Sequence, residues 1–440
     1  MERQLRRYII PNILAMTGTS CYVLADTFFI SLAAGADGIT ALNLVLPLYA
    51  LIFAIGSMIG TGSATRYALS KSNGDKSADD YFSNSVWCTL LFSSIFVAAG
   101  VFFPDKILSL LGADTDILDT GLSYTRIVLC FTPFFMLNYT FTAFVRNDSA
   151  PKLAMTATLL SGLFNIIFDY ILMFPLEMGM AGAALATGIS PVISMSVCMI
   201  HYISKKNTIV FTKSIPSAKK LISACSLGIA AFIGELSSGI TTLVFNFMLL
   251  HLSGNTAVAA YGIVANAALV ATALFNGVSL GLQPVASRAH GHGDILSERK
   301  ILRSALKIAL CIAFITVALT YLFTEQLIAV FNSEGSATLA SYARTGLHLY
   351  FPGFLIASVN IIKAGFYSAV GKGKESSLIA LSRGIFSITI MAFLLSHFLG
   401  VTGVWLAFPA SELITLAIAL TVGRKDRKNR KVREANDHNM

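Results

Sequence analysis

Two short apolar stretches of this chain carry isolated acids. Asn165 and Asp169 lie in residues 151–174, where the only other charged residue stands at the start, and Asp26 is the only charged residue of 8–34. The i, i+4 spacing of Asn165 and Asp169 places both side chains on one face of a helix. A carboxylate in mid-membrane costs about 2.5–3.5 kcal/mol on insertion scales. Carboxylate and amide oxygens suit a small hard cation, and buried carboxyls can also carry protons. The residues therefore predict a cation or proton site.

The depth of these acids in their spans supports one shared site. Both aspartates lie about 18 residues from the same end of their apolar stretch, which is about 27 Å along a helix. Thr187 and Tyr124 lie at a similar level when counted from the opposite end, so their hydroxyls are candidate ligands. Pro11 removes a backbone hydrogen bond early in the first stretch and is a candidate hinge. The alternative is that the aspartates only form hydrogen bonds between helices.

Composition identifies the elements that hold these residues. The chain is 55% hydrophobic and 12% charged, with a mean hydropathy of +0.71, which predicts an all-α polytopic membrane protein. We expect the first apolar stretch to be a retained span, because it lacks the cleavage site of a signal peptide. The predicted spans are 8–34, 40–68, 80–103, 117–146, 151–174, 180–204, 219–251, 256–288, 301–323, 337–370, 375–398 and 401–423.

Positive charge predicts the orientation of these spans. Of the 32 Lys and Arg residues, 27 fall on the side of the N-terminus, one on the other side and four within spans. This bias places both termini in the cytoplasm of a plasma (inner) membrane protein. The net charge of +9 comes largely from the tail after span 12. It therefore predicts contact with anionic lipid headgroups rather than with nucleic acid.

The chain repeats itself at about half its length. Ser-Tyr-x-Arg begins at Ser123 and again at Ser341, and Gly-x-x-Gly begins at Gly179 and again at Gly400, with nearly the same separation. Six spans per repeat is an even number, so the halves run the same way through the membrane. This predicts 12 transmembrane helices in two pseudo-twofold-related six-helix bundles with a cleft between them. The expected divisions are an N-lobe (1–204), a cytoplasmic linker (205–218), a C-lobe (219–423) and a basic cytoplasmic tail (424–440).

The two halves differ in their intramembrane charges. The repeat places Val244 opposite Asp26 and apolar residues opposite Asp169, so the aspartate pair belongs to one half. In the C-lobe, Glu235 is either a cation-attracting cleft residue or the partner of a base such as Lys363. Glu412 is a further candidate cleft residue. We expect Arg383 to extend its side chain to the cytoplasmic interface.

Several other kinds of site are excluded or disfavoured. The chain has no P-loop and no dinucleotide fingerprint, so it is not expected to be an enzyme driven by ATP or a cofactor. His290 and His292 have too few ligands nearby for a metal site. The remaining energy source is an ion gradient of H⁺ or Na⁺.

Taken together, these motifs resemble the multidrug and toxic compound extrusion (MATE) family. The resemblance rests on Asp26-Thr-Phe-Phe, Asn165-x-x-x-Asp169, the paired Ser-Tyr-x-Arg and Gly-x-x-Gly motifs, and the elements 60–66 and 74–75 after span 2. It implies a V-shaped pair of bundles and efflux of drug-like, often cationic compounds. In the DinF-like branch it implies an N-lobe cation site, whose counterparts here are Asp26, Asn165, Asp169, Thr187, Tyr124 and the bendable Pro11.

The resemblance to the NorM-like branch is partial. Glu235 resembles the span 7 glutamate of that branch, but the span 10 acid of that branch is missing from Val359–Lys363. We therefore expect coupling through the N-lobe in a cation-coupled antiporter that exports amphipathic compounds by alternating access. A monomer is expected, because two lobes in one chain need no partner to form a cleft. The alternatives are a flippase for lipid-linked sugars and a non-transporting scaffold or receptor.

Overall fold

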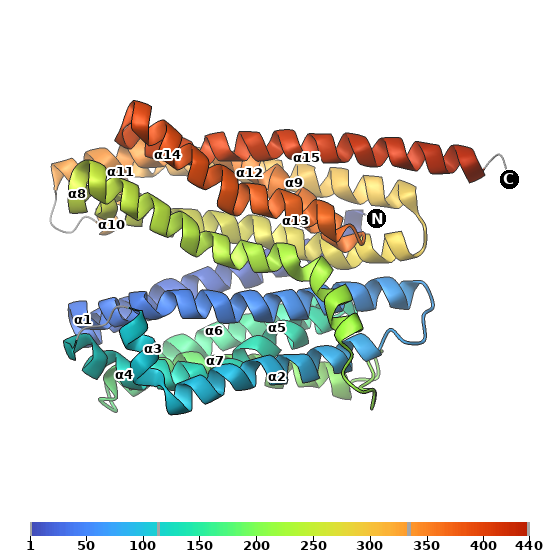
Figure 1. Cartoon of the computed structure of the whole chain (residues 1–440), viewed down its shortest axis with the longest axis horizontal. Coiled ribbons are helices and arrows are strands. Elements are labelled where there is room, and N and C mark those ends of the chain that lie inside the picture. Colours follow the sequence, from blue (N-terminus) through green and yellow to red (C-terminus); the bar gives the residue numbers. More distant parts are fainter. Residues whose placement is uncertain (1, 112–114, 332–335, 438–440) are drawn as a thin grey trace.

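The computed structural model describes residues 2–111, 115–331 and 336–437, and every regular element in those ranges is a helix (Figure 1). Residues 438–440 of the predicted basic tail lie outside the described ranges, and α15 extends through the rest of it. The elements are α1 (Glu2–Ser72), α2 (Asp80–Phe102), α3 (Pro104–Leu110), α4 (Thr115–Cys130), α5 (Thr132–Asn147), α6 (Pro151–Met173), α7 (Gly179–Ile203), α8 (Ala218–Gly291), α9 (Ile295–Leu322), α10 (Thr324–Phe331), α11 (Ala337–Tyr350), α12 (Gly353–Ala369), α13 (Gly373–Leu381), the π-helical turn η1 (Ser382–Phe386), α14 (Ser387–Leu399) and α15 (Val401–Asp437).

The two longest helices, α1 and α8, each contain two membrane spans. Gly35 interrupts α1 with φ 58° and ψ −146°, and Gly254 interrupts α8 with φ 70° and ψ −164°. Glycine adopts these dihedral angles without the steric cost of a side chain. The two glycines are separated by about half the chain, as are the paired sequence motifs, so the same break occurs at matching places in the two halves.

The span count agrees with the prediction. The described residues contain nine helices long and apolar enough to cross a membrane, or eleven if each bent pair is one span. Counting α8 as two spans at Gly254 gives twelve. The bent pairs are α4–α5, at 45°, and α11–α12, at 48°. Both bends occur beside a proline that follows the repeated Ser-Tyr-x-Arg motif, Pro133 seven residues and Pro352 eight residues after its arginine, where the helix loses a backbone donor.

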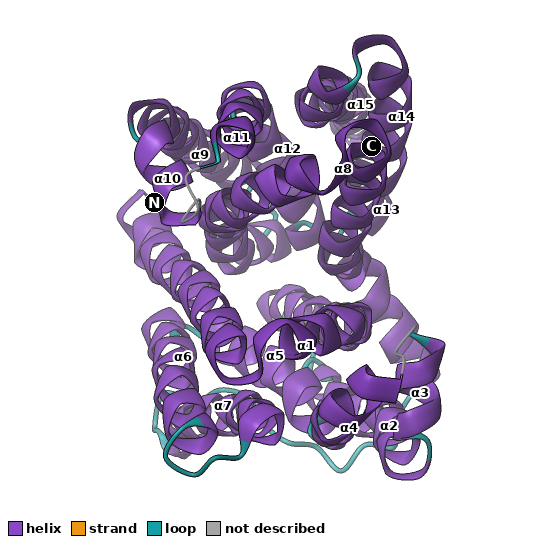
Figure 2. Ribbon diagram, turned by 90° about the vertical axis from the view of Figure 1, so that its left-hand side faces the viewer, coloured by secondary structure: helices purple, strands orange, loops and turns teal. Residues whose placement is uncertain are grey.

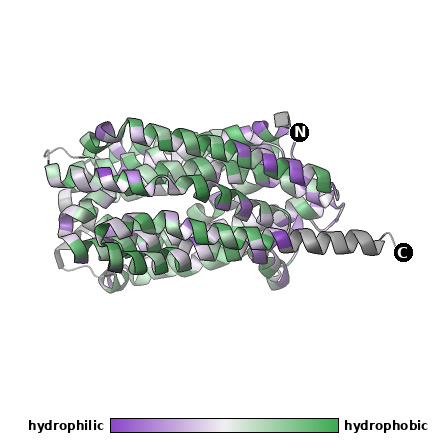
Figure 3. Cartoon of the chain, turned by 90° about the horizontal axis from the view of Figure 1, so that it is seen from above, coloured by the Kyte–Doolittle hydropathy of each residue, from purple (hydrophilic) through white to green (hydrophobic). Residues whose placement is uncertain are grey.

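The helices form two bundles, α1–α7 and α8–α15 (Figure 2). The contact between the bundles is made mainly by α1 and α8. Many large apolar side chains are exposed, as expected for spans that face lipid, and hydrophobic residues run along the helices of both bundles (Figure 3). We call the end that holds both termini the terminal end. It also holds the turns at 73–79, 148–150, 204–217, 292–294 and 370–372, and the opposite end is called the distal end (Figure 1).

Two close helix contacts join the bundles at the terminal end. A Cβ added at Gly228 would overlap the carbonyl oxygen of Met58, and one added at Gly281 would lie 2.6 Å from the Cα of Ile9. Small residues permit this backbone approach between membrane helices. About three turns further toward the distal end, on the same face of α8 as Gly228, a Cβ at Gly239 would meet nothing within 4 Å. The bundles are therefore packed together at the terminal end, and this face of α8 is open at Gly239.

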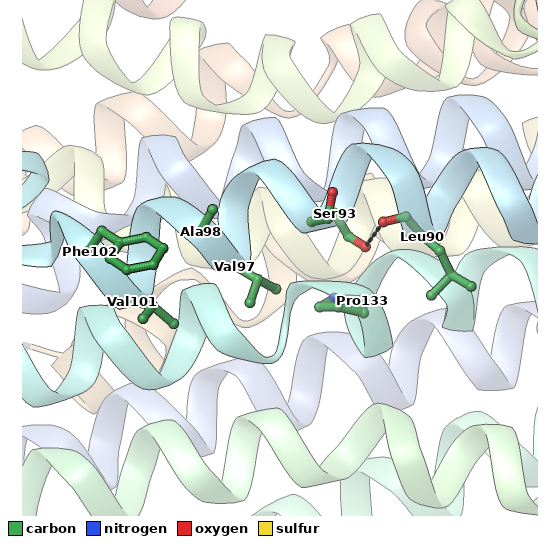
Figure 4. Close-up of a pocket in the computed structure, with 8 residues that line it drawn as sticks. Leu90, Ser93, Val97, Ala98, Val101, Phe102 and Pro133 are labelled. Atoms are coloured by element: carbon green, nitrogen blue, oxygen red, sulfur yellow. Dashed lines mark hydrogen bonds between the residues drawn. The ribbon is translucent and has the colours of Figure 1, made fainter.

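A hollow of about 530 Å³ lies away from this interface. It is lined by α2 residues between Leu90 and Phe102 and by Pro133 of α5 (Figure 4). None of these lining residues is charged. The hollow therefore lacks the chemistry of an ion site.

Candidate functional site

Close packing of α1 on α6 positions the two aspartates. A Cβ added at Gly18 would overlap Cδ2 of Leu159, and one added at Gly162 would lie 2.9 Å from Cδ1 of Tyr22. Both helices run from the terminal end to the distal end. About two turns beyond these glycines, α1 carries Asp26 and α6 carries Asp169. The carboxyl groups of the two residues are close enough to interact electrostatically.

Asn165 and Thr187 complete the polar surroundings of this pair. The side chains of Asn165 and Asp169 are 0% exposed. The Nδ2 group of Asn165 donates a hydrogen bond of 3.4 Å to Oγ1 of Thr187, which lies on α7. The structure therefore brings together four of the residues that the sequence singled out.

Four oxygen atoms at this place have no hydrogen-bond donor among the described residues. They are Oδ1 of Asp26, Oδ1 of Asn165 and both carboxyl oxygens of Asp169. Buried polar atoms in folded proteins nearly always have a partner, and two ionised carboxyls side by side repel each other. A proton shared between the carboxyls, or a small cation bound by these oxygens, would satisfy the cluster.

Tyr124 lies beside the cluster and has a tyrosine partner that the sequence reasoning missed. Its hydroxyl group is 3.2 Å from the hydroxyl group of Tyr49, in the second span of α1. Both tyrosines are close enough to Asp26 and Asp169 for electrostatic interaction. The sequence gives the depth of Tyr49, nine residues into span 2 from the distal end, but not the face of the helix from which its side chain projects. Pro11 is buried, and α1 remains helical across it.

The ligand set suits a light cation better than a transition metal. Within the part of the chain that is described, no three His, Cys, Asp or Glu side chains lie close enough together to hold a metal ion. The cluster offers two carboxylates, an amide and a hydroxyl. These oxygen donors suit a hard cation such as Na⁺, and the carboxyls could instead carry a proton.

Glu235 faces the other bundle. The hydroxyl of Tyr139, on α5, donates to Oε1 of Glu235 at 3.4 Å, and Tyr22 is near enough to interact electrostatically. This places an acid of the second half where the two bundles meet. Lys363, its candidate partner from the sequence, donates to the carbonyl oxygen of Ala419 at 3.4 Å.

Glu412 lies inside the second bundle and is paired with a base. It is 1% exposed. It accepts hydrogen bonds of 2.8 Å from Nε of Arg383 and 2.8 Å from Nδ2 of Asn360. The prediction that Arg383 extends to the cytoplasmic interface is wrong, because a buried carboxylate one span further along the chain provides its partner. Arg383 stands in the π-helical turn η1, a type of distortion often found at functional sites.

Both halves of the chain match one family model. The MatE model matches residues 11–171 and 230–393. Among curated proteins, the chain is 26% identical over 423 residues to the multidrug export protein MepA of Staphylococcus saprophyticus, covering 94% of this chain and 92% of that protein. It is also 26% identical over 428 residues to MepA of Staphylococcus aureus, covering 96% of this chain and 93% of that protein.

Solved structures share the fold over nearly the whole chain. A crystal structure of MATE in complex with MaL6 superposes with a TM-score of 0.91 at 22% identity, covering 98% of this chain and 97% of the other. An outward-facing conformation of a multidrug resistance MATE family transporter of the MOP superfamily gives a TM-score of 0.90 at 22% identity, covering 98% and 96%. These proteins have the architecture of 12 helices in two bundles described above.

Proposed function

Because the chain belongs to the MatE family of membrane transporters, we propose that it is an antiporter. It would export amphipathic, often cationic, compounds in exchange for H⁺ or Na⁺ by alternating access. The relatives named multidrug export proteins support the substrate class. The observation that carries ion coupling is the cluster of four oxygen atoms without donors on Asp26, Asn165 and Asp169.

The arrangement of the bundles supports alternating access. The bundles are in backbone contact at the terminal end, and there is open space at Gly239, on the same face of α8 as Gly228. With both termini in the cytoplasm of the plasma membrane, as the charge bias predicts, this is an outward-open state. Ion binding between α1 and α6 would favour a shift of α1, with Pro11 as the flexible point.

The residues take distinct roles in this proposal. Asp26 and Asp169 carry the ion, with Asn165, Thr187 and Tyr124 around them. Glu235 and Tyr139 meet the organic cation at the interface between the bundles. Lys363 and Glu412 remain candidate cleft residues of the C-lobe, although the Arg383 partner of Glu412 favours a structural role. The lobes are 1–204 and 219–423, joined by the linker 205–218 and followed by the tail 424–440, in a monomer that contacts membrane lipids.

A flippase for lipid-linked sugars is less well supported. Such a protein needs basic residues that face the cleft to hold pyrophosphate. Here Arg383 forms an ion pair with Glu412, and Arg146 is buried and donates to Asn12. The acid at the bundle interface, Glu235, would instead repel a phosphate.

Dye efflux from proteoliposomes tests the proposal. The native chain would be given a proton gradient and, separately, a sodium gradient. Asp169→Asn would be compared with Glu177→Gln, which neutralises an exposed acid of the same half. We expect uphill efflux of a cationic dye under one gradient, abolished by Asp169→Asn and unchanged by Glu177→Gln. Efflux that survives Asp169→Asn at normal expression would contradict coupling at this site.

A further inference from the structure

An arginine of the second bundle forms polar contacts with the first at the terminal end. Arg288, near the end of α8, donates from Nη2 to the carbonyl oxygen of Asn147 at 2.5 Å and to Oγ of Ser149 at 2.8 Å. Its Nη1 donates to the hydroxyl of Tyr8 at 3.1 Å, and its guanidinium carbon lies 5.8 Å from the centre of the Tyr8 ring. Hydrogen bonds from a charged group are among the stronger contacts in proteins. All three partners belong to the first bundle.

The loop that receives Arg288 is held firmly from its other side. Asp148, between the two acceptors, is 6% exposed. One of its oxygens lies 2.8 Å from Nε2 of His201 and accepts from the backbone N–H of Thr208 at 2.8 Å, and the other accepts from the Thr208 hydroxyl. Asp148 thereby fastens the loop to the end of α7 and to the linker between the halves. The acceptors of Arg288 are therefore held in place by contacts that do not involve the second bundle.

The corresponding positions on the other side of the interface pack through apolar atoms, and the polar contact nearby is a single one, from Nη2 of Arg66 to the carbonyl oxygen of Ser223 at 3.2 Å. Along the repeat, Arg288 of the second half corresponds to Leu69 of the first, and Ser149 of the first half corresponds to Gly371 of the second. Helices α6 and α13 both start two residues after these loop positions. A Cβ at Gly371 would lie 3.7 Å from Cδ1 of Leu69. Leu69 packed on Gly371 is thus sufficient at this position. The repeated fold by itself therefore does not explain why residue 288 is an arginine.

The backbone conformation of Ser149 is strained, whereas the same conformation at its counterpart Gly371 is not. Ser149 has φ 72°, and Gly371 has φ 76°. A left-handed backbone is uncommon for residues other than glycine, and strain of this kind is retained where the side chain has a use. The hydroxyl of Ser149 is an acceptor for Arg288, which glycine could not supply.

We propose that Arg288 and the loop Asn147–Ser149 form a latch that holds the terminal end closed. Opening this end requires all the Arg288 contacts on one side of the interface to break together, and the single Arg66 contact on the other side to break as well. The latch sets how often the outward-open state converts to the inward-open state. It rests on the proposed alternating access, since it has no role in a protein whose bundles do not move.

Distance measurements between the bundles test the latch without relying on transport. Spin labels would be attached to Lys152→Cys and Lys300→Cys, two exposed positions on opposite bundles. The background is the full chain with its six cysteines replaced. Double electron–electron resonance would then compare the parent chain with Arg288→Gln, Ser149→Gly and the control Arg303→Gln, an exposed arginine on α9. Dye efflux would be recorded for each variant.

We expect Arg288→Gln to raise the ratio of open to closed molecules at the terminal end about tenfold or more, from the loss of charge-assisted hydrogen bonds. Ser149→Gly relieves strain and should raise the melting temperature, so it can open the latch without impairing folding. The change in distance in Ser149→Gly should be smaller than that in Arg288→Gln and in the same direction. Unchanged distances in both variants with normal efflux would overturn the latch and leave the proposed function intact. If Arg288→Gln shifts the distances but the parent chain shows no efflux, the result would contradict the proposed function and support the latch.

Discussion

Neutralising Asp169 should stabilise the protein while it abolishes coupled transport. Asp169 is 0% exposed, and neither of its carboxyl oxygens has a donor among the described residues. In Asp169→Asn the volume hardly changes, but the amide can donate to the orphan Oδ1 of Asp26. The substitution therefore removes a repulsion and supplies a hydrogen bond at the same place.

The size of the effect follows from the charges. Two ionised carboxyls about 4 Å apart repel by about 4 kcal/mol at an effective dielectric constant of about 20. A hydrogen bond to the remaining carboxylate adds about 1.5–3 kcal/mol. Even if relaxation removes half of this sum, about 3 kcal/mol remains, enough to raise the melting temperature by a few degrees. The gain should be full at alkaline pH, where both carboxyls are ionised, and should shrink as the pH falls and the native pair takes up a proton.

The assay is thermal unfolding in detergent across pH, combined with dye efflux from proteoliposomes. Glu177→Gln, at an exposed acid, is the matched control for both measurements. If Asp26 and Asp169 served only to hold helices together, the opposite pattern is expected: Asp169→Asn would lower the melting temperature and leave efflux intact. That result would refute the reasoning, because it would mean that the carboxyl groups serve helix packing and do not carry an ion.

Three further substitutions test the neighbouring features. Arg383→Met should cost about 3–5 kcal/mol, because it leaves the buried carboxylate of Glu412 without its counter-charge, and adding Glu412→Gln should restore most of the melting temperature. Gly228→Ala should open the terminal end in distance measurements, since its Cβ would overlap the carbonyl oxygen of Met58; an unchanged distance would show that α8 shifts locally instead. Glu235→Gln should raise the KM for a monocationic dye about tenfold, the scale of one lost charge contact, and leave a neutral substrate unaffected; equal loss for both would argue against direct recognition.

Much of the scaffold is predictable because membrane spans leave strong local signals. The repeated Ser-Tyr-x-Arg motif predicts the same element in each half, and it corresponds to the two bent pairs beside Pro133 and Pro352. Depth counting also selected Asp26, Asn165 and Asp169, which the structure brings together. Depth in the spans predicted a shared site correctly for these residues because α1 and α6 run in the same direction and pack closely.

Depth alone does not say which way a side chain points around its helix. Arg383 was therefore expected at the interface, whereas it points to Glu412 on the next span. Tyr49 was missed for a related reason, since only its contact with Tyr124 shows that it faces the cluster. The contacts of Arg288 were beyond prediction from local patterns. Its partners Asn147 and Tyr8 are far from it in the sequence and become neighbours only when the bundles meet.

One helix connects the ion cluster with the latch. Asp26 and Tyr8 both lie on α1, about 18 residues and about 27 Å apart. The helix has no backbone break between them, although Pro11 removes one hydrogen bond there. A bend at Pro11 when an ion binds beside Asp26 would turn the segment that carries Tyr8 relative to the rest of α1, and so displace the Tyr8 hydroxyl and with it one contact of Arg288. Because the second half has no aspartate pair at the matching positions, the ion site of the first half, acting on Arg288 of the second, would determine when the terminal end opens.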